Sequence, residues 1–305
     1  MIPEIAVCLV TYQNEAEIGP ALAAVRAQDI PCEIHVWDNA SRDETRRIVR
    51  AFPAATLHES EINLGFCGGI NRLVALTRAP YLLFLNPDTR LEPGCLRRLH
   101  ATLVDAPPDV AGVGPKLIKP GEPRRIDSAG MELHRRKMSP ADRGEGREDR
   151  GQFDEPGESF GPSFACALLR REAVAALSLD GEFLDESFFA YYEDVDLAWR
   201  AWRRGYRFLY EPRAVCAHRR GHPEHHGPTL AARAFVNRYL LWIANEDGRD
   251  GWLYLLGRVP YELARLLWKC LQTPGFAVAW RMLAADWRRA WRKRRAVARL
   301  GGSPR

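Results

Sequence analysis

The feature that most constrains this fold is a five-residue apolar run, Tyr81 to Leu85, that stops abruptly at Asn86-Pro87-Asp88. An uninterrupted apolar run of this length is typical of a strand buried on both faces, as in a parallel sheet. Proline ends such a strand, and ligands bind at the carboxyl ends of strands in open α/β sheets. Asp88 is therefore a candidate ligand-binding residue. The alternative is that Asp88 only caps a helix starting near Pro93, because aspartate is common at helix N-termini.

Apolar runs alternate with helical spacing through the first part of the chain. Strands are expected at residues 4–12, 34–37, 56–58, 81–85 and 110–118. Helices are expected at residues 15–28, after Ser41, at about 70–77 and at about 93–104. Ser41 and Glu44 have the spacing of a capping box. This alternation predicts an α/β fold with a mostly parallel central sheet flanked by helices.

Residues 119–160 break this pattern, because they are rich in Pro, Gly and charged residues and show little periodicity. A stretch of this length without regular structure is usually a functional loop. Order returns further along the chain. We expect an apolar strand at 163–169, helices at 171–177 and 193–204, and strands at 206–210 and 215–218.

The composition bounds the class of protein. With 305 residues and 46% hydrophobic residues, the chain can form one large α/β domain or two small ones. The formal net charge of +5 does not by itself indicate nucleic-acid binding. Seven cysteines without a Cys-x-x-Cys pair indicate free thiols in a reducing compartment. No apolar window is long enough for a transmembrane helix, so we expect none. The free thiols and an N-terminus without the features of a signal peptide fit a cytoplasmic protein.

The character of the sequence changes at about residue 230, where Trp, Leu and Tyr begin to alternate with Arg and Lys. We therefore divide the chain into a domain at 1–229 and a basic, amphipathic helical region at 230–305. Clustered Arg with Trp is typical of helices that lie on an anionic membrane surface. The alternative is a helical appendage that packs on the domain or forms a homodimer. No motif supports nucleic-acid binding by this region.

Polar residues follow four of the predicted strands. They lie at 11–15, 38–39, 63–71 and 86–88. Parallel strands place their carboxyl ends on one edge of the sheet, so these residues should converge on one crevice. The glycines between Gly65 and Gly69 permit close backbone approach to a ligand. They match neither a Walker loop nor the dinucleotide fingerprint, which disfavours a P-loop or a Rossmann NAD site.

An acidic run, Glu193-Asp194-Val195-Asp196, opens a predicted helix. Acidic residues are favoured there by the helix dipole alone, which is the structural alternative. Four aromatic residues precede the run: Phe188, Phe189, Tyr191 and Tyr192. Aromatic side chains beside carboxylates suit a hydroxylated ligand such as a sugar and supply the desolvation that tunes a general base.

Histidines form a further group near the end of the last predicted strand. His218, at the strand end, is a candidate metal ligand. We interpret His222, His225 and His226 as loop residues, with the role of His222 left open.

Five motifs, in this order, resemble the family 2 inverting glycosyltransferases, and within them the bacterial rhamnosyltransferase-like branch. The motifs are Thr11-Tyr12-Gln13-Asn14, Asp38-Asn39-Ala40-Ser41-Arg42-Asp43, Asn63-Leu64-Gly65-Phe66 with Asn71, Leu85-Asn86-Pro87-Asp88, and Tyr192-Glu193-Asp194-Val195-Asp196. The resemblance covers roughly residues 4–222. It implies a GT-A fold, a nucleotide-sugar donor and a divalent cation, Mg²⁺ or Mn²⁺.

The resemblance also implies roles for single residues. Residues implied to bind the nucleotide sugar are Thr11, Tyr12, Asn14, Asp38, Asn39, Asn63, Gly65, Asn71 and Asn86. Asp88 would bind the metal, and His218 would complete its coordination. Asp194 would be the catalytic base, with Glu193 as the competing candidate. Tyr191, Tyr192 and Glu193 would face the acceptor. Many family members carry Asp-x-Asp where this chain has Asn86, so one carboxylate is lost near the metal.

The resulting hypothesis is a metal-dependent inverting glycosyltransferase at the inner face of the cell membrane. Its expected donor is dTDP-rhamnose or a UDP-sugar, and its expected acceptor is a surface glycan or a lipid-linked glycan. The alternatives are a nucleotidyltransferase and a non-catalytic nucleotide-sugar-binding module. A nucleotidyltransferase would have a basic glycine-rich loop near the N-terminus, and residues 10–20 contain no Lys or Arg.

Overall fold

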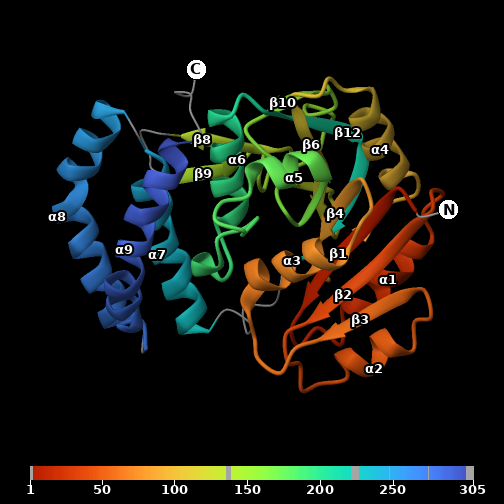
Figure 1. Cartoon of the computed structure of the whole chain (residues 1–305), viewed down its shortest axis with the longest axis horizontal. Helices are drawn as coiled ribbons and strands as arrows, with labels where there is room; N and C mark the ends of the chain where they lie inside the picture. Colours follow the sequence, from red (N-terminus) through yellow and green to blue (C-terminus); the bar gives the residue numbers. More distant parts are fainter. Residues whose placement is uncertain (1–2, 135–138, 221–226, 247, 274, 300–305) are drawn as a thin grey trace.

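The computed structural model describes residues 3–134, 139–220, 227–246, 248–273 and 275–299. Within them, a ten-stranded mixed sheet runs through the centre of the molecule in the order β10-β12-β6-β11-β4-β1-β2-β3 (Figure 1). β5 joins this sheet beside β12, and β7 joins it beside β6. A separate pair of strands, β8 and β9, lies next to the C-terminal helices.

The elements of the first half follow the expected alternation. They are β1 (Ile5–Thr11), α1 (Ile18–Arg26), β2 (Cys32–Asp38), α2 (Thr45–Arg50), β3 (Ala55–Glu59), α3 (Gly65–Leu76), β4 (Tyr81–Leu85), β5 (Thr89–Leu91), α4 (Cys95–Asp105) and β6 (Val110–Lys119). The second half begins with short strands and ends in long helices. Its elements are β7 (Arg125–Ser128), β8 (Met131–His134), β9 (Ser139–Asp142), β10 (Gly157–Ser159), β11 (Cys166–Arg170), α5 (Arg171–Leu177), η2 (Glu186–Phe188), α6 (Glu193–Arg203), β12 (Arg207–His218), α7 (Pro228–Asn245), α8 (Arg249–Gln272) and α9 (Val278–Ala298).

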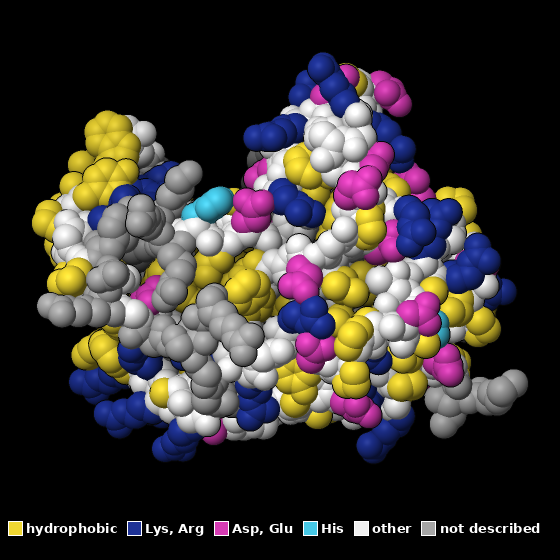
Figure 2. Space-filling view, turned by 90° about the horizontal axis from the view of Figure 1, so that it is seen from above, with side chains coloured by type: hydrophobic (Ala, Val, Ile, Leu, Met, Phe, Trp, Pro, Cys, Tyr) yellow, Lys and Arg dark blue, Asp and Glu magenta, His cyan; other side chains and the backbone are white. Residues whose placement is uncertain are grey.

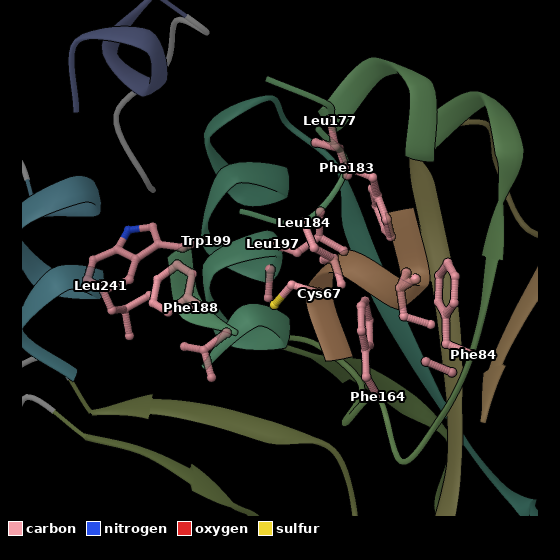
Figure 3. Packing of buried hydrophobic residues seen from close by; sticks show 14 of the residues in the cluster. Cys67, Phe84, Phe164, Leu177, Phe183, Leu184, Phe188, Leu197, Trp199 and Leu241 are labelled. Carbon is pink, nitrogen blue, oxygen red and sulfur yellow. The ribbon is translucent and has the colours of Figure 1, made fainter. Parts of the chain in front are cut away.

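Two apolar clusters cover the two faces of the sheet. Every residue of β1 is buried, and its side chains alternate between the clusters. One cluster packs the sheet against α1 and α4. The other packs it against α3, α5 and α6 and continues into α7 (Figure 3). The predicted α/β class with helices on both faces is thus confirmed, and the buried apolar strands are its cause.

The four strands β3, β2, β1 and β4 are parallel to one another, as predicted. β11 then lies antiparallel between β4 and β6, which makes the sheet mixed. The prediction that 119–160 lacks regular structure is wrong, because β7 to β10 lie there. These strands have only three or four residues and carry charged side chains, so they are too short to show a clear alternation of apolar and polar residues. The two strands expected at 206–210 and 215–218 are one bulged strand, β12.

Three local predictions also need correction. Ser41 does not cap α2, because its hydroxyl oxygen accepts a hydrogen bond from the Gln13 backbone N–H instead. The glycine-rich segment is not a turn before a helix at 70–77, since α3 begins at Gly65 itself. The Asp88 cap is also wrong, because α4 begins at Cys95, after Gly94.

The C-terminal helices α7, α8 and α9 lie side by side at one end of the molecule (Figure 1). α7 packs on α6, where the rings of Trp199 and Trp242 meet edge to face at 4.9 Å. All seven cysteines are free thiols, as predicted. In the part of the chain that the structure describes, no helix has both the length and the apolar character needed to cross a bilayer.

Candidate active site

The ends of β1 and β2 form the first part of the candidate site. Thr11 and Asp38 are register partners on neighbouring parallel strands. The Thr11 hydroxyl donates to Asn14 Oδ1 at 3.0 Å, and the Tyr12 backbone N–H donates to the same oxygen. Asn14 therefore fixes the turn that follows β1, while the Tyr12 side chain lies exposed above it.

Asp38 is fully buried and only partly satisfied. Its Oδ1 accepts from the Ser41 backbone N–H at 3.0 Å and from Arg46 Nε at 2.5 Å. Its Oδ2 is buried and has no hydrogen-bond partner among the described residues. Buried polar atoms are rarely left without a partner, so this oxygen is a candidate acceptor for a ligand N–H.

The asparagines after β2 and β3 hold the next loop in place. Asn39 Nδ2 donates to the Gly65 carbonyl, and Asn39 Oδ1 accepts from the Leu64 backbone N–H. Asn63 Oδ1 accepts from the Gly65 N–H at 2.8 Å. Gly65 has φ +73°, and a Cβ there would collide with the Phe189 carbonyl. The close approach expected at this glycine is thus made by the protein's own chain.

Asn71 lies apart from the strand ends, on α3. Its amide donates to the Leu184 carbonyl at 2.8 Å and accepts from the Leu184 N–H at 2.9 Å. Both ends of the amide therefore hold the segment that precedes the acidic run. A role for Asn71 in binding the nucleotide sugar stays a prediction.

Asp88 and His218 face each other at the end of β4. The antiparallel register of β5 and β12 pairs His218 with Thr89, which brings the imidazole beside Asp88. His218 Nε2 lies 3.5 Å from Asp88 Oδ1. Asn86, two residues earlier, donates its backbone N–H to the Ala165 carbonyl. His222, His225 and His226 lie outside the described residues.

Asp127 of β7 holds the other nitrogen of His218, with Asp127 Oδ2 2.8 Å from Nδ1. The carboxylate is fully buried. Burial alone would lower the pKa of His218, but the hydrogen bonds to Asp127 and Asp88 outweigh it and raise the pKa to about 9. Sequence reasoning missed Asp127, because it lies in the stretch interpreted as a loop. The available signal was an aspartate inside the small and apolar run from Ile126 to Met131.

These side chains fit a divalent cation. A carboxylate oxygen and an imidazole nitrogen face one point, and a second carboxylate orients the imidazole, which is the usual support for a metal-binding histidine. Among the described residues, no three His, Cys, Asp or Glu side chains form a metal-binding group. A bound diphosphate and water are ligands that would complete such a site, as is common for Mg²⁺.

We expect Asp127→Asn to weaken Mn²⁺ binding in the presence of a nucleoside diphosphate by about 10–100-fold, the usual effect of losing such a support. Isothermal titration with Mn²⁺ measures it. The control is Asp154→Asn, which removes a more exposed carboxylate that pairs with Lys116. Equal Mn²⁺ affinity in Asp127→Asn and wild type would contradict the assignment of His218 as a ligand.

Arg220 gathers acidic residues beside the same histidine. Its guanidinium contacts Asp127 Oδ1 at 2.6 Å, Asp142 Oδ2 at 2.5 Å and Glu145 Oε1 at 3.4 Å. It therefore ties β7 and β9 to the end of β12. The sequence did not single out Arg220 or its partners.

The acidic run begins α6 after a strained segment. Phe189, Tyr191 and Tyr192 all have φ between 62° and 73°, which is unusual for residues with bulky side chains. Such strain persists only where the surrounding structure enforces it, and it is often found at functional sites. Asn237 of α7 enforces it here, because its Nδ2 lies 2.8–2.9 Å from the carbonyls of Phe188, Ala190 and Tyr191.

We expect Asn237→Ala to lower kcat more than it lowers the folded fraction, because the strained segment before Asp194 loses its support. The lost buried hydrogen bonds would cost about 1–3 kcal/mol of stability. The matched control is Asn245→Ala, another buried α7 asparagine, which bonds to Asp196 and the Leu241 carbonyl instead. Steady-state kinetics and thermal unfolding of both variants test this. Equal losses of kcat per folded molecule would show that Asn237 has no specific positioning role.

The two carboxyls at the start of α6 have raised pKa values. Burial, followed by repulsion from Asp194, raises the pKa of Glu193 to about 8, and Glu193 Oε2 has no hydrogen-bond partner in the described structure. Burial and the negative charge of Asp142 raise the pKa of Asp194 to about 6. Asp194 also accepts from the backbone N–H groups of Val195 and Phe164. Both carboxyls therefore keep their protons to a higher pH than ordinary acidic side chains do, and Glu193 does so more than Asp194.

The two halves of the site meet at Tyr191. Burial raises the pKa of Tyr191 to about 12, and the charges of Glu193 and Asp88 add to this effect. Tyr191 therefore lies within the electrostatic reach of both the strand-end aspartate and the acidic run. Asp88 and His218 thus face each other, while the convergence of the start of α6 on the same site stays a prediction.

Comparison with known proteins identifies the family. The model of glycosyl transferase family 2 matches residues 6–178, which is more than half of the chain. The chain belongs to glycosyltransferase family 2. It is an enzyme of the inverting type typical of this family, and it transfers a sugar from a nucleotide sugar. The two alternatives, a nucleotidyltransferase and a non-catalytic nucleotide-sugar-binding module, do not agree with this assignment.

Several proteins resemble this family 2 enzyme. N-acetylglucosaminyl-diphospho-decaprenol L-rhamnosyltransferase of Mycobacterium tuberculosis is 26% identical over 283 residues, covering 83% of this chain and 87% of the relative. The mannosyltransferase PcManGT of Pyrobaculum calidifontis, solved with GDP-Man and Mn²⁺, has a TM-score of 0.58 at 17% identity, over 98% of this chain and 86% of that one. Residues 1–349 of Staphylococcus aureus TarS, solved with UDP-GlcNAc, give 0.55 at 14% identity, over 96% and 91%. These neighbours establish the GT-A fold.

Proposed function

We propose that this family 2 enzyme transfers rhamnose, or a related sugar, from a nucleotide-sugar donor to a hydroxyl of a lipid-linked or cell-surface glycan. The observation that carries the proposal is the facing pair of Asp88 and His218 at the end of β4. The rhamnosyltransferase relative, which aligns over most of both chains, supports the sugar and the lipid-linked acceptor.

The donor's nucleotide would lie over the ends of β1 and β2. Asp38 Oδ2, buried and without a hydrogen-bond partner among the described residues, would accept from a base N–H. Thr11, Tyr12 and Asn14 would contact the base and ribose from the turn after β1. Asn39, Asn63 and Gly65 would line the same site through the loop that they hold, and Asn86 would lie at its floor.

Asp88 and His218 would hold a divalent cation, Mg²⁺ or Mn²⁺, against the diphosphate. When bound, such a cation neutralises the charge that develops on the leaving nucleoside diphosphate. A solved neighbour contains Mn²⁺ with GDP-Man, which favours Mn²⁺ as the ion to test first. Asp127 would keep the imidazole of His218 oriented toward the site.

Asp194 would act as the general base. The acceptor oxygen attacks the anomeric carbon from the face opposite the diphosphate, the bond between that carbon and the diphosphate oxygen breaks, and the acceptor proton moves to an Asp194 carboxylate oxygen. A raised pKa makes Asp194 a stronger base while it is still ionised at neutral pH. Tyr191, Tyr192 and Glu193 would line the acceptor side.

We expect the acid limb of kcat/KM to follow the ionisation of Asp194. The base works only when deprotonated, so activity should be lost as pH falls through about 6. After burial, the negative charge of Asp142 of β9 contributes most to the raised pKa of Asp194. Asp142→Asn should therefore shift the limb to lower pH. Glu145→Gln, another Arg220 partner, should leave it in place, and an unmoved limb in Asp142→Asn would argue against Asp194 as the titrating group.

A transfer assay tests the proposed function. The purified chain is incubated with Mn²⁺, a panel of nucleotide sugars and a polyprenyl-diphospho-N-acetylglucosamine acceptor. We expect transfer from dTDP-rhamnose to exceed transfer from the UDP- and GDP-sugars in the panel. Transfer of another sugar would refute the choice of donor, and transfer only to an acceptor without a lipid would refute the choice of acceptor.

We place this activity in the cytoplasm, at the inner face of the cell membrane. Residues 1–229 would perform the transfer, and the basic helices within 230–305 would bring the enzyme to the lipid-linked acceptor. This division fits the exposed arginines and tryptophans of α9, which include Trp280, Trp287 and Trp291.

A further inference from the structure

α8 has apolar side chains on its inward and on its outward side, which is unusual for a surface helix; Leu255, Leu266 and Cys270 pack inward on the core. A helix on a protein surface normally turns its apolar side inward. The outward side of α8 is instead uncharged over most of its length. Its exposed large apolar residues are Leu253, Leu256, Val259, Tyr261, Leu263, Leu267, Trp268 and Leu271. Hydrophobic side chains accordingly dominate the outer edge of the molecule where α8 lies (Figures 1 and 2).

The charged side of α8 faces α7. Glu262 is 7% exposed and lies 2.7 Å from Arg238, 3.3 Å from Arg258 and 3.5 Å from Arg265. One carboxylate thus serves three guanidinium groups. Lys269, two turns after Glu262, adds a further cation that makes no ion pair with any described residue. Arg238, Arg265 and Lys269 therefore outnumber Glu262, the one carboxylate in the described part of the chain with which the two arginines pair between α7 and α8.

This space contains a cavity of about 290 Å³, which we call the α7–α8 groove. Its lining residues include Tyr192, Phe235, Arg238, Arg265, Lys269 and Phe276. Arg265 stacks over the ring of Phe235 at 5.2 Å, so the groove combines aromatic walls with cations. Tyr192 forms its end nearest the active site, because the residue directly precedes Glu193 and Asp194.

The chemistry of the groove selects an anionic group attached to an apolar chain. Guanidinium and ammonium groups bind phosphate oxygens strongly, and the adjoining outer face of α8 suits hydrocarbon. The charges of Arg238 and Arg265 act on the Tyr192 hydroxyl, and so does the charge of Asp194. A phosphate in the groove would therefore lie on the acceptor side of the active site, away from the strand ends proposed for the donor.

We propose that the α7–α8 groove binds the diphosphate of a lipid-linked acceptor, while the outward face of α8 lies in the surface of an anionic bilayer. The identity of the ligand rests on the proposed function, in which the acceptor's diphosphate is attached to an apolar chain and the donor's diphosphate to a nucleoside. Charge favours the bilayer over a second copy of the chain. No Asp or Glu with a described side chain is exposed on α7, α8 or α9, whereas Arg281, Arg288 and Arg295 of α9 are exposed. If two copies of the chain met through these helices, their exposed arginines would repel each other. Anionic lipid, in contrast, attracts these arginines.

Binding of farnesyl diphosphate to the full-length chain tests the groove. The titration is done by calorimetry in EDTA without donor, so a wrong donor sugar leaves the result unaffected. We expect Lys269→Ala and Arg265→Gln each to weaken binding by about tenfold, the usual scale for a charge-assisted contact. Arg281→Gln, an exposed cation on α9, is the control and should bind as wild type does. Lys269 is exposed, so its loss should not affect folding.

Two comparison ligands identify what the groove recognises. Inorganic diphosphate and farnesol should each bind more weakly than farnesyl diphosphate, because each supplies half of the ligand. Unchanged affinity in Lys269→Ala would overturn the proposal. If phosphatidylglycerol vesicles displace farnesyl diphosphate from the groove, the groove binds lipid headgroups of the bilayer. That result would overturn the assignment of the groove to the acceptor.

Vesicle flotation tests the α8 face. We expect the chain to float with vesicles of phosphatidylcholine and phosphatidylglycerol, and the double variant Leu267→Glu with Leu271→Glu to reduce its partitioning by about tenfold or more. Leu76→Glu changes a similarly exposed leucine on α3 and should have no effect. Equal flotation of wild type and double variant would overturn this part. So would a wild-type dimer, seen by sedimentation equilibrium, that the double variant dissociates.

Discussion

Replacing Asp194 with asparagine is expected to lower kcat by about 10²–10⁴-fold, the usual contribution of a general base. Asparagine has nearly the same shape, and its amide oxygen can keep the 2.8 Å contact with the Val195 backbone N–H, although the weaker contact of the second oxygen with Phe164 is lost. It cannot take the proton from the acceptor hydroxyl. Donor affinity, measured by calorimetry with the nucleoside diphosphate and Mn²⁺, should stay unchanged, because Asp194 lies on the acceptor side.

Glu193→Gln is the matched control for this prediction. The pKa of Glu193 is raised further than that of Asp194, so a neutral glutamine should change kcat near neutral pH far less than Asp194→Asn does. At higher pH, where Glu193 would be ionised, Glu193→Gln also removes a negative charge next to Asp194. If Glu193→Gln abolishes transfer and Asp194→Asn retains it, the base is Glu193, which the sequence left as the competing candidate.

Replacing Asp88 with alanine is expected to lower metal-dependent turnover by about 10²–10³-fold. This estimate follows from the several kcal/mol that a cation contributes to stabilising a leaving group, at about 1.4 kcal/mol for each factor of ten. Asn86 stands where many family members have a second carboxylate, so no nearby acid in that motif would replace Asp88. Titration of initial rates with Mn²⁺ should show a higher half-saturating concentration in the variant.

Asp105→Ala removes an exposed carboxylate at the end of α4 and is the control for Asp88→Ala. It should keep the wild-type rate and the wild-type Mn²⁺ dependence. Full Mn²⁺-dependent turnover by Asp88→Ala would refute the assignment of Asp88 as a metal ligand. His218 would then be the only proposed protein ligand left.

The sequence predicted the parts of the fold that strong local patterns determine. The buried run of β4 and the fully buried β1 indicated a parallel sheet, and that pattern also located the strand-end residues of the site. The register of Thr11 with Asp38 follows directly from two neighbouring parallel strands. Asp88 could be predicted because it follows the strongest strand signal in the chain.

The supporting residues could not be predicted, because they come from weak patterns far away in the chain. Asp127 reaches His218 only through β7, a four-residue strand inside a charged and glycine-rich stretch. Asn237 supports the segment before Asp194 from a helix that begins 35 residues after the start of α6. The amphipathic pattern of α8 was visible in the sequence, but pattern alone does not tell which side of a helix faces the protein.

A crystal structure of the full chain with Mn²⁺ and a nucleoside diphosphate tests the central claim most directly. We predict that the cation will contact Asp88 and His218 and bridge the diphosphate, with the base at Asp38 and the Asp194 carboxylate facing the position of the transferred sugar from the opposite side. A cation held by other side chains, or an Asp194 carboxylate turned away from that position, would contradict the account.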